Sequence, residues 1–165
     1  MPIFLPFVAA ATLAVVAPPT SSVAPIVAPY SIAASGQPTW RTIHADTVGD
    51  LLLTTETLNG RVRFSARGMK GSVPVVTSDF TPDSVRAWVG SATELVSSAA
   101  PKQGEMSGLG QALTINVTTA TTGETVFGFY VGDATSDQQL ALALKKPDAL
   151  KLTAGVNSAL DAVGH

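Results

Sequence analysis

Apolar and polar residues alternate in several short segments after residue 40, which predicts β-strands with one buried face. In residues 61–67, for example, Val62, Phe64 and Ala66 fall on one side of the strand and mostly polar residues on the other. An Asn-Gly pair at 59–60 is a strong signal for a tight hairpin turn before this strand. The strand-like segments are 39–46, 50–58, 61–67, 73–77, 113–118, 127–131 and 140–144.

Two segments instead repeat their apolar residues with the period of an amphipathic α-helix. The first spans about 82–99, with Thr81 suited to the N-cap and Pro82 to the first helical position. The second spans about 147–163, and Gly155 within it costs about 1 kcal/mol relative to alanine. The buried stripe predicted for the first helix consists of Val85, Trp88, Val89, Ala92, Leu95, Val96 and Ala99.

The order of these elements is strands, helix, strands, helix, so the chain resembles two similar halves. Short connections favour antiparallel pairing over parallel crossovers. The sequence therefore predicts an α+β fold, in which an antiparallel meandering sheet packs both helices, about 82–99 and 147–163, on one face. Residues 100–110, with three glycines, are predicted to form a loop. The opposite face of the sheet would carry Arg61, Arg63, Arg67, Asn116 and Thr118.

The first forty residues contain no Lys, Arg, Asp, Glu or His. The apolar run 1–17 predicts a signal-like leader or a retained anchor, and the proline-rich segment 18–39 predicts an extended arm before a single domain at 40–165. As a helix, the fifteen residues 3–17 of the apolar run would cover about 22 Å, less than the hydrocarbon core of about 30 Å. Trp40, where the arm meets the domain, is predicted to clamp that junction. Contact with a partner or a membrane is predicted for Ile3, Phe4, Leu5, Phe7 and Val8.

Cleavage of the leader and its retention are both open alternatives. The small-x-small sites that end at Ala17 and Ala24 are each followed by proline, which fits poorly in a protease site. The site Ser31-Ile32-Ala33 has no proline after it, so cleavage there is possible. There is no positive charge before Arg41 that would keep the N-terminus in the cytoplasm. The domain that follows is long enough to be translocated whatever its charge. These features predict a membrane-associated protein on the periplasmic or extracellular side.

The overall composition narrows the class of partner. Apolar residues make up 45% of the chain and charged residues 13%, which is typical of a weakly charged globular protein. A net charge of −2 gives no general attraction to nucleic acid, which is not a predicted partner. The absence of cysteine excludes disulfides and thiolate metal sites.

Basic residues nevertheless concentrate in one place. Four of the ten lie within ten positions, at Arg61, Arg63, Arg67 and Lys70, and the three arginines share one strand face. One interpretation is a solvated face that keeps the sheet soluble. The other is a docking surface for carboxylates, phospholipid headgroups or an acidic partner, which the guanidinium geometry suits. No aromatic residues interleave with the arginines on that face, which argues against nucleic acid.

No residue pattern predicts catalysis, a cofactor or a metal site. The two histidines, His44 and His165, have no metal-ligating neighbours at a suitable spacing, and no Gly-x-Ser-x-Gly motif occurs. His44 is predicted to be a surface residue of a strand. Asp133 and Asp137 flank a turn, and ordinary turn chemistry explains them better than cation binding.

Three general features carry a resemblance to known proteins: the export-type leader, the body rich in Ala, Thr, Val and Ser, and the helical segment Ser84-Val85-Arg86-Ala87-Trp88-Val89. In these the chain resembles small exported bacterial proteins, one setting for which is the extrinsic subunits of photosynthetic reaction centre–light-harvesting complexes. The resemblance implies a non-catalytic accessory subunit that docks on and stabilises a membrane-embedded complex, with membrane protein subunits or lipid as partners and no cofactor.

Two other functions stay open. A free periplasmic or secreted binding module, for a small apolar ligand or a protein partner, would lose the leader and hold a pocket between helix 82–99 and the sheet. A hydrolase with an unrecognised site is the third hypothesis. Retention of Met1 together with comigration with membrane proteins would favour the accessory subunit.

Overall fold

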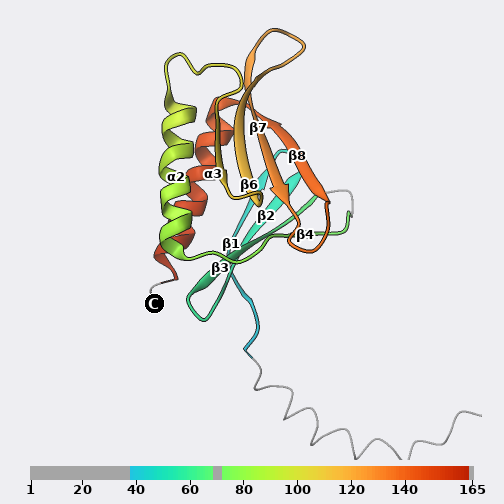
Figure 1. Cartoon of the computed structure of the whole chain (residues 1–165), viewed down its shortest axis with the longest axis vertical. Helices are drawn as coiled ribbons and strands as arrows, with labels where there is room; N and C mark the ends of the chain where they lie inside the picture. The colour runs from blue at the N-terminus through green and yellow to red at the C-terminus, as the bar shows by residue number, and fades with distance from the viewer. Residues whose placement is uncertain (1–37, 69–71, 164–165) are drawn as a thin grey trace, which may run out of the picture. The chain divides into compact units, whose positions relative to one another are not determined.

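The computed structural model describes residues 38–68 and 72–163, which form two four-stranded antiparallel sheets and two helices (Figure 1). The strand order is β1-β2-β3-β4 in the first sheet and β5-β6-β7-β8 in the second. One helix follows each sheet along the chain, so the two predicted halves are present. The elements are β1 (Arg41–Val48), β2 (Leu51–Leu58), β3 (Arg61–Gly68), β4 (Val75–Val76), α2 (Pro82–Ser97), β5 (Met106–Leu109), β6 (Leu113–Thr119), β7 (Thr125–Gly132), β8 (Gln139–Leu144) and α3 (Lys146–Asp161).

The predicted α+β class and antiparallel meander are confirmed, and the strands divide into two sheets where α2 interrupts the meander between β4 and β5. The prediction of a loop over 100–110 is wrong in part, because β5 lies within it. Ser107 and Leu109 are buried on one face of β5, and the strand pairs with β6. Gly108 within β5, and Gly104 and Gly110 close to it, obscured this alternation in the sequence.

The Asn-Gly turn between β2 and β3 forms as predicted. Asn59 and Gly60 both have positive φ, and Leu58 pairs directly with Arg61 across the turn. This two-residue turn sets the register of the whole hairpin. It therefore decides which β2 residues lie opposite the arginines of β3.

The helices α2 and α3 lie side by side and run antiparallel (Figure 1). The side chain of Thr81 caps α2 by accepting a hydrogen bond from the Ser84 amide, as the sequence predicts. Neither helix has a basic residue in its own last turn. Instead, Lys146 of α3 donates to the Ser97 and Ser98 carbonyls, and Arg86 of α2 donates to the Leu160 carbonyl. Each helix thus satisfies C-terminal carbonyls of the other with a cation, which favours both dipoles.

A single hydrophobic core joins the helices to the inner faces of both sheets. Trp88 of α2 is 3% exposed, and its Nε1 donates to the Ser107 carbonyl at 3.3 Å. This confirms Trp88 as a core residue and shows that it fills space between α2 and β5. The largest fully buried side chains include Phe64, Phe127, Phe129, Leu53, Leu113, Ile115, Leu152 and Leu160.

His44 is a strand residue, as the sequence predicts, but it is less exposed than a surface residue. It is half-buried on β1, and its Nε2 lies 2.8 Å from Oδ2 of Asp46. Both side chains approach α3 at Gly155, where there is no room for a Cβ atom. From His44 to Val48 the strand alternates regularly, so His44 and Asp46 share the inward side with the buried Val48, and a bulge between Thr42 and His44 ends this alternation.

Candidate docking surface

The three arginines of β3 lie on the outer face of the first sheet, opposite the buried Val62, Phe64 and Ala66. The register places Arg61 across from Leu58, Arg63 across from Glu56, and Arg67 across from Leu52. Arg61 and Arg63 are half-buried, whereas Arg67 is exposed. The other residues predicted for docking or partner contact, Lys70, Ile3, Phe4, Leu5, Phe7 and Val8, lie outside the described residues.

Two of these arginines form ion pairs within the chain. Arg61 Nε lies 2.7 Å from Oδ2 of Asp79, and its Nη2 also donates to the Asp79 carbonyl at 3.1 Å. The hydrogen bond from Arg61 holds the pKa of the Asp79 carboxyl below its usual value. Arg63 Nε lies 2.6 Å from Oε2 of Glu56. Two of the three arginines are therefore neutralised by their own neighbours, so this face attracts acidic groups less than the sequence suggests.

Arg63 also stacks on Trp40. Its guanidinium carbon lies 4.3 Å from the centroid of the indole ring, within the range of a cation–π contact. Because Glu56 holds the same guanidinium from β2, the half-buried indole is fixed against the outer face of the sheet. We call Trp40, Glu56 and Arg63 the Trp40 cluster. It secures the first residues of the domain, immediately after the stretch without charge.

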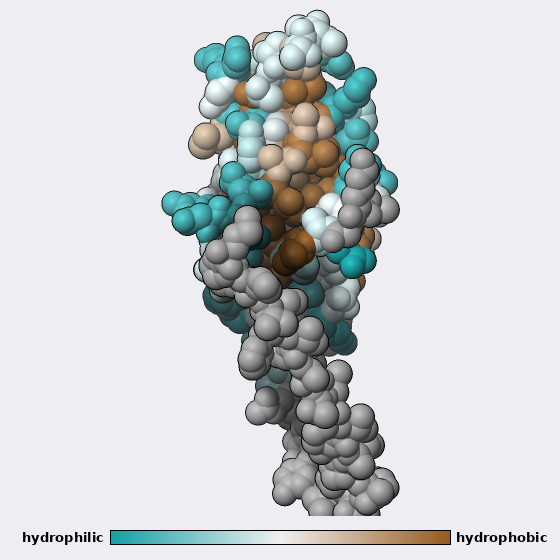
Figure 2. Space-filling model, turned by 90° about the vertical axis from the view of Figure 1, so that its right-hand side faces the viewer, coloured by the Kyte–Doolittle hydropathy of each residue, from teal (hydrophilic) through white to brown (hydrophobic). Residues whose placement is uncertain are grey.

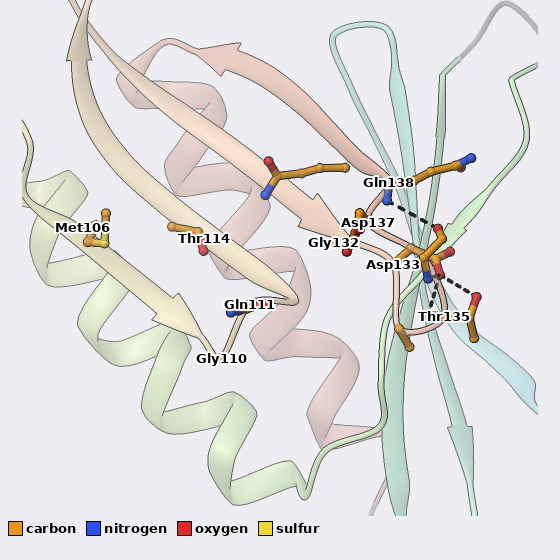
Figure 3. Close-up of a pocket in the computed structure, with 12 residues that line it drawn as sticks. Met106, Gly110, Gln111, Thr114, Gly132, Asp133, Thr135, Asp137 and Gln138 are labelled. Atoms are coloured by element: carbon orange, nitrogen blue, oxygen red, sulfur yellow. Dashed lines mark hydrogen bonds between the residues drawn. The ribbon is translucent and has the colours of Figure 1, made fainter.

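A hollow of about 500 Å³ adjoins the Trp40 cluster. It is bordered by Asp79 of the segment that follows β4 and by the turn 133–135 of the second sheet. On the far side of that turn lies a larger groove of about 650 Å³ (Figure 3). The lining of this groove is mainly polar and includes Met106, Gln111, Thr114, Asp133, Thr135, Asp137 and Gln138.

Asp133 holds the turn between the hollow and the groove, and it also joins the two sheets. Its Oδ1 accepts hydrogen bonds from the Thr135 amide and hydroxyl and the Ser136 amide, at 2.6–2.9 Å (Figure 3). Its Oδ2 accepts from the Val76 amide of β4, and the Ala134 amide donates back to the Val76 carbonyl. These hydrogen bonds lower the pKa of Asp133 to about 2, and the bond from the Thr135 hydroxyl has the largest effect. Turn chemistry therefore accounts for Asp133.

Acid should weaken this link in a predictable range of pH. Because the pKa of Asp133 falls from 3.8 to about 2 on folding, its charge stabilises the fold above pH 4. That contribution is lost as the pH falls from about 4 towards 2. Urea unfolding of the wild type should therefore show a steeper loss of stability over this range than unfolding of Asp133→Asn. Asp50→Asn, at an exposed position in the turn between β1 and β2, is the control, and it should follow the wild type. If the free energy of unfolding fell equally with pH in all three proteins, the role given to Asp133 would be contradicted.

Within residues 38–68 and 72–163, no group of three or more His, Cys, Asp and Glu side chains is arranged to hold a metal ion. Over the same residues, no helix is both long enough and apolar enough to cross a membrane. The chemistry of this face is thus that of ion pairs, hydrogen bonds and one aromatic stack.

Comparisons of the chain with protein-family models, with curated proteins and with solved structures find no match. Function is therefore inferred from the residues of this chain.

Proposed function

We propose that this protein is a non-catalytic extrinsic accessory subunit that docks on and stabilises a membrane-embedded multisubunit complex, on the periplasmic or extracellular side. The uncharged N-terminal segment would contact the membrane subunits through apolar side chains such as Ile3 and Phe4. The domain would contact them through the outer face of its first sheet. A bacterial photosynthetic reaction centre–light-harvesting assembly is the setting that the resemblance suggests.

The observation that carries this proposal is the Trp40 cluster. Tryptophan and arginine are the residues that most often dominate binding energy at protein interfaces. Here the Trp40 ring and the Arg63 guanidinium are already stacked and held by Glu56, so little side-chain freedom would be lost on binding. Trp40 is the last residue of the charge-free segment, so the segment and the cluster would engage one partner together.

The ion pairs of this face favour a protein partner over a lipid surface. Anionic headgroups bind clusters of free lysines and arginines, each worth about 1 kcal/mol. Arg61 and Arg63 are committed to Asp79 and Glu56, which leaves little net positive charge among the described residues of the face. A protein surface can instead use the shape, the half-exposed ring of Trp40 and the paired polar groups.

The alternative function is a free binding module for an apolar ligand or a protein partner. Its apolar-ligand form needs space between α2 and the sheet. Val85, Trp88 and Val89 occupy that interface and are at most 6% exposed. We therefore favour the accessory subunit.

The test uses the full chain, tagged at its C-terminus, in the organism that makes it. After mild detergent extraction, native gradients should show the wild type migrating with a membrane complex. Trp40→Ala should lower the comigrating fraction at least tenfold, as loss of an interface anchor does. Met106→Ala removes another exposed apolar side chain, on β5, and should have no effect. Equal retention of all three proteins would remove the role of the Trp40 cluster, and a wild type found only free would contradict the proposed function.

A further inference from the structure

The strand β8 forms one edge of the second sheet. In the part of the chain that the structure describes, it pairs with β7 alone, over Gln139 to Leu144. Figure 2 faces the side of the molecule on which β8 lies and shows hydrophobic side chains gathered down the middle of it. Such an edge presents unpaired backbone N–H and C=O groups beside apolar side chains, which suits the addition of another strand.

The sequence of β8 lacks the features that normally protect an edge strand. Edge strands of soluble proteins usually carry a charge, a proline or a bulge. The six residues of β8, Gln-Leu-Ala-Leu-Ala-Leu, contain no charge and no proline, and they pair with β7 in unbroken register. Leu140 and Leu142 are only half-buried, and Ala141 and Ala143 are exposed. Among residues 38–68 and 72–163, no other strand covers this edge, so it can accept a partner strand.

We propose that β8 pairs antiparallel with β8 of a second copy of this chain, about a two-fold axis through Ala141. In a continuous sheet, directly opposed residues share a face, so a symmetric register must centre on a residue. Centred on Ala141, Leu140 of one copy lies opposite Leu142 of the other, and Ala141 lies opposite itself. The half-buried leucines of the two copies would then cover one another.

Charge at the ends of β8 selects this register. The strand is preceded by Asp137 and followed by Lys145, both exposed. Centring on Ala141 places Asp137 of each copy across from Lys145 of the other, whereas centring on Leu142 would place it across from Pro147. Among the described residues, the Lys145 ammonium has only a weak, exposed contact with Glu124, at 3.9 Å. The resulting eight-stranded sheet would carry both pairs of helices on one side.

Disulfide trapping tests the register directly, because the chain contains no cysteine. In the purified full chain, Ala141→Cys gives each copy one cysteine at the centre of the paired strands. The Cα atoms of these two cysteines would lie about 4.5–5.5 Å apart, within the range of a disulfide. Ala143→Cys lies on the same face, but the two copies of it would be about 13 Å apart along the strands. Ala87→Cys, exposed on α2, measures random collision. Mild oxidation should crosslink the 141 variant at least tenfold faster than either control.

A charge swap provides the second test and leaves the fold intact. Asp137→Lys and Lys145→Asp should each weaken dimerisation of the full chain about tenfold in analytical ultracentrifugation, because like charges then face one another. Mixing the two variants, or combining both changes in one chain, should restore it. Lys145 is the N-cap of α3 without a side-chain cap bond, a position that aspartate suits.

Two results would overturn the proposal. One is crosslinking at 141 no faster than at 143 or 87. The other is equal association of the single-charge variants and the wild type.

Discussion

Replacement of Trp88 by alanine should lower the free energy of unfolding by about 3–5 kcal/mol, the range for a large aromatic residue removed from a core. The side chain is 3% exposed and lies between α2 and β5. Its loss would leave a cavity and also leave the Ser107 carbonyl without its indole donor. Urea unfolding followed by circular dichroism measures the change.

Trp40→Ala is the matched control, because it removes the same side chain from a half-exposed position. Only the stack on Arg63 and partial burial are lost there, so its cost should be about 1 kcal/mol. This contrast separates a tryptophan that holds the fold from one available to a partner. Equal costs for the two changes would mean that the helix–sheet interface is loosely packed, and the apolar-ligand function would regain support.

Replacement of Gly155 by alanine should destabilise the domain by about 1–3 kcal/mol, the usual cost of overpacking. Helix propensity alone predicts the opposite, a gain of about 1 kcal/mol. A Cβ at this position of α3 would overlap Oδ2 of Asp46 and come within 3.2 Å of Nε2 of His44. The Asp46 side chain would have to turn away, which breaks its contact with His44 at 2.8 Å.

Gly90→Ala in α2 is the control for Gly155→Ala. Nothing lies within 4 Å of a Cβ added at Gly90, so that change should stabilise the protein by about 1 kcal/mol. In an Asp46→Ala background the cost at Gly155 should largely disappear, because the obstructing carboxylate is gone. An unchanged cost in that background, measured by thermal unfolding, would rule out the steric explanation.

Local signals in the sequence predict most of the fold. Proline and threonine at the start of α2, most of its apolar stripe and the Asn-Gly turn each act over a few residues, and each is seen in the structure. The exception is the end of the stripe: α2 ends at Ser97, Leu95 is half-buried, and Ala99 is exposed beyond the helix. The division into two sheets could not be read in this way. It depends on which strands find partners after α2 and on long-range contacts, such as that between Asp133 and Val76, which are 57 residues apart.

The candidate docking surface was predictable only in part. Strand alternation places the three arginines on one face, and the two-residue turn at 59–60 implies that Glu56 lies opposite Arg63. Asp79 lies 18 residues from Arg61, and nothing in the sequence marks the two as a pair. The stack on Trp40 likewise depends on the path of the chain before β1. The sequence therefore shows no partner for Arg61, whereas in the fold both Arg61 and Arg63 form ion pairs.

Intact mass measurement on the protein recovered from the native membrane complex tests the accessory-subunit proposal most directly. We expect the chain to comigrate with membrane subunits and its mass still to include the uncharged N-terminal segment. Recovery only as a free protein, with the mass of residues 34–165, would contradict it.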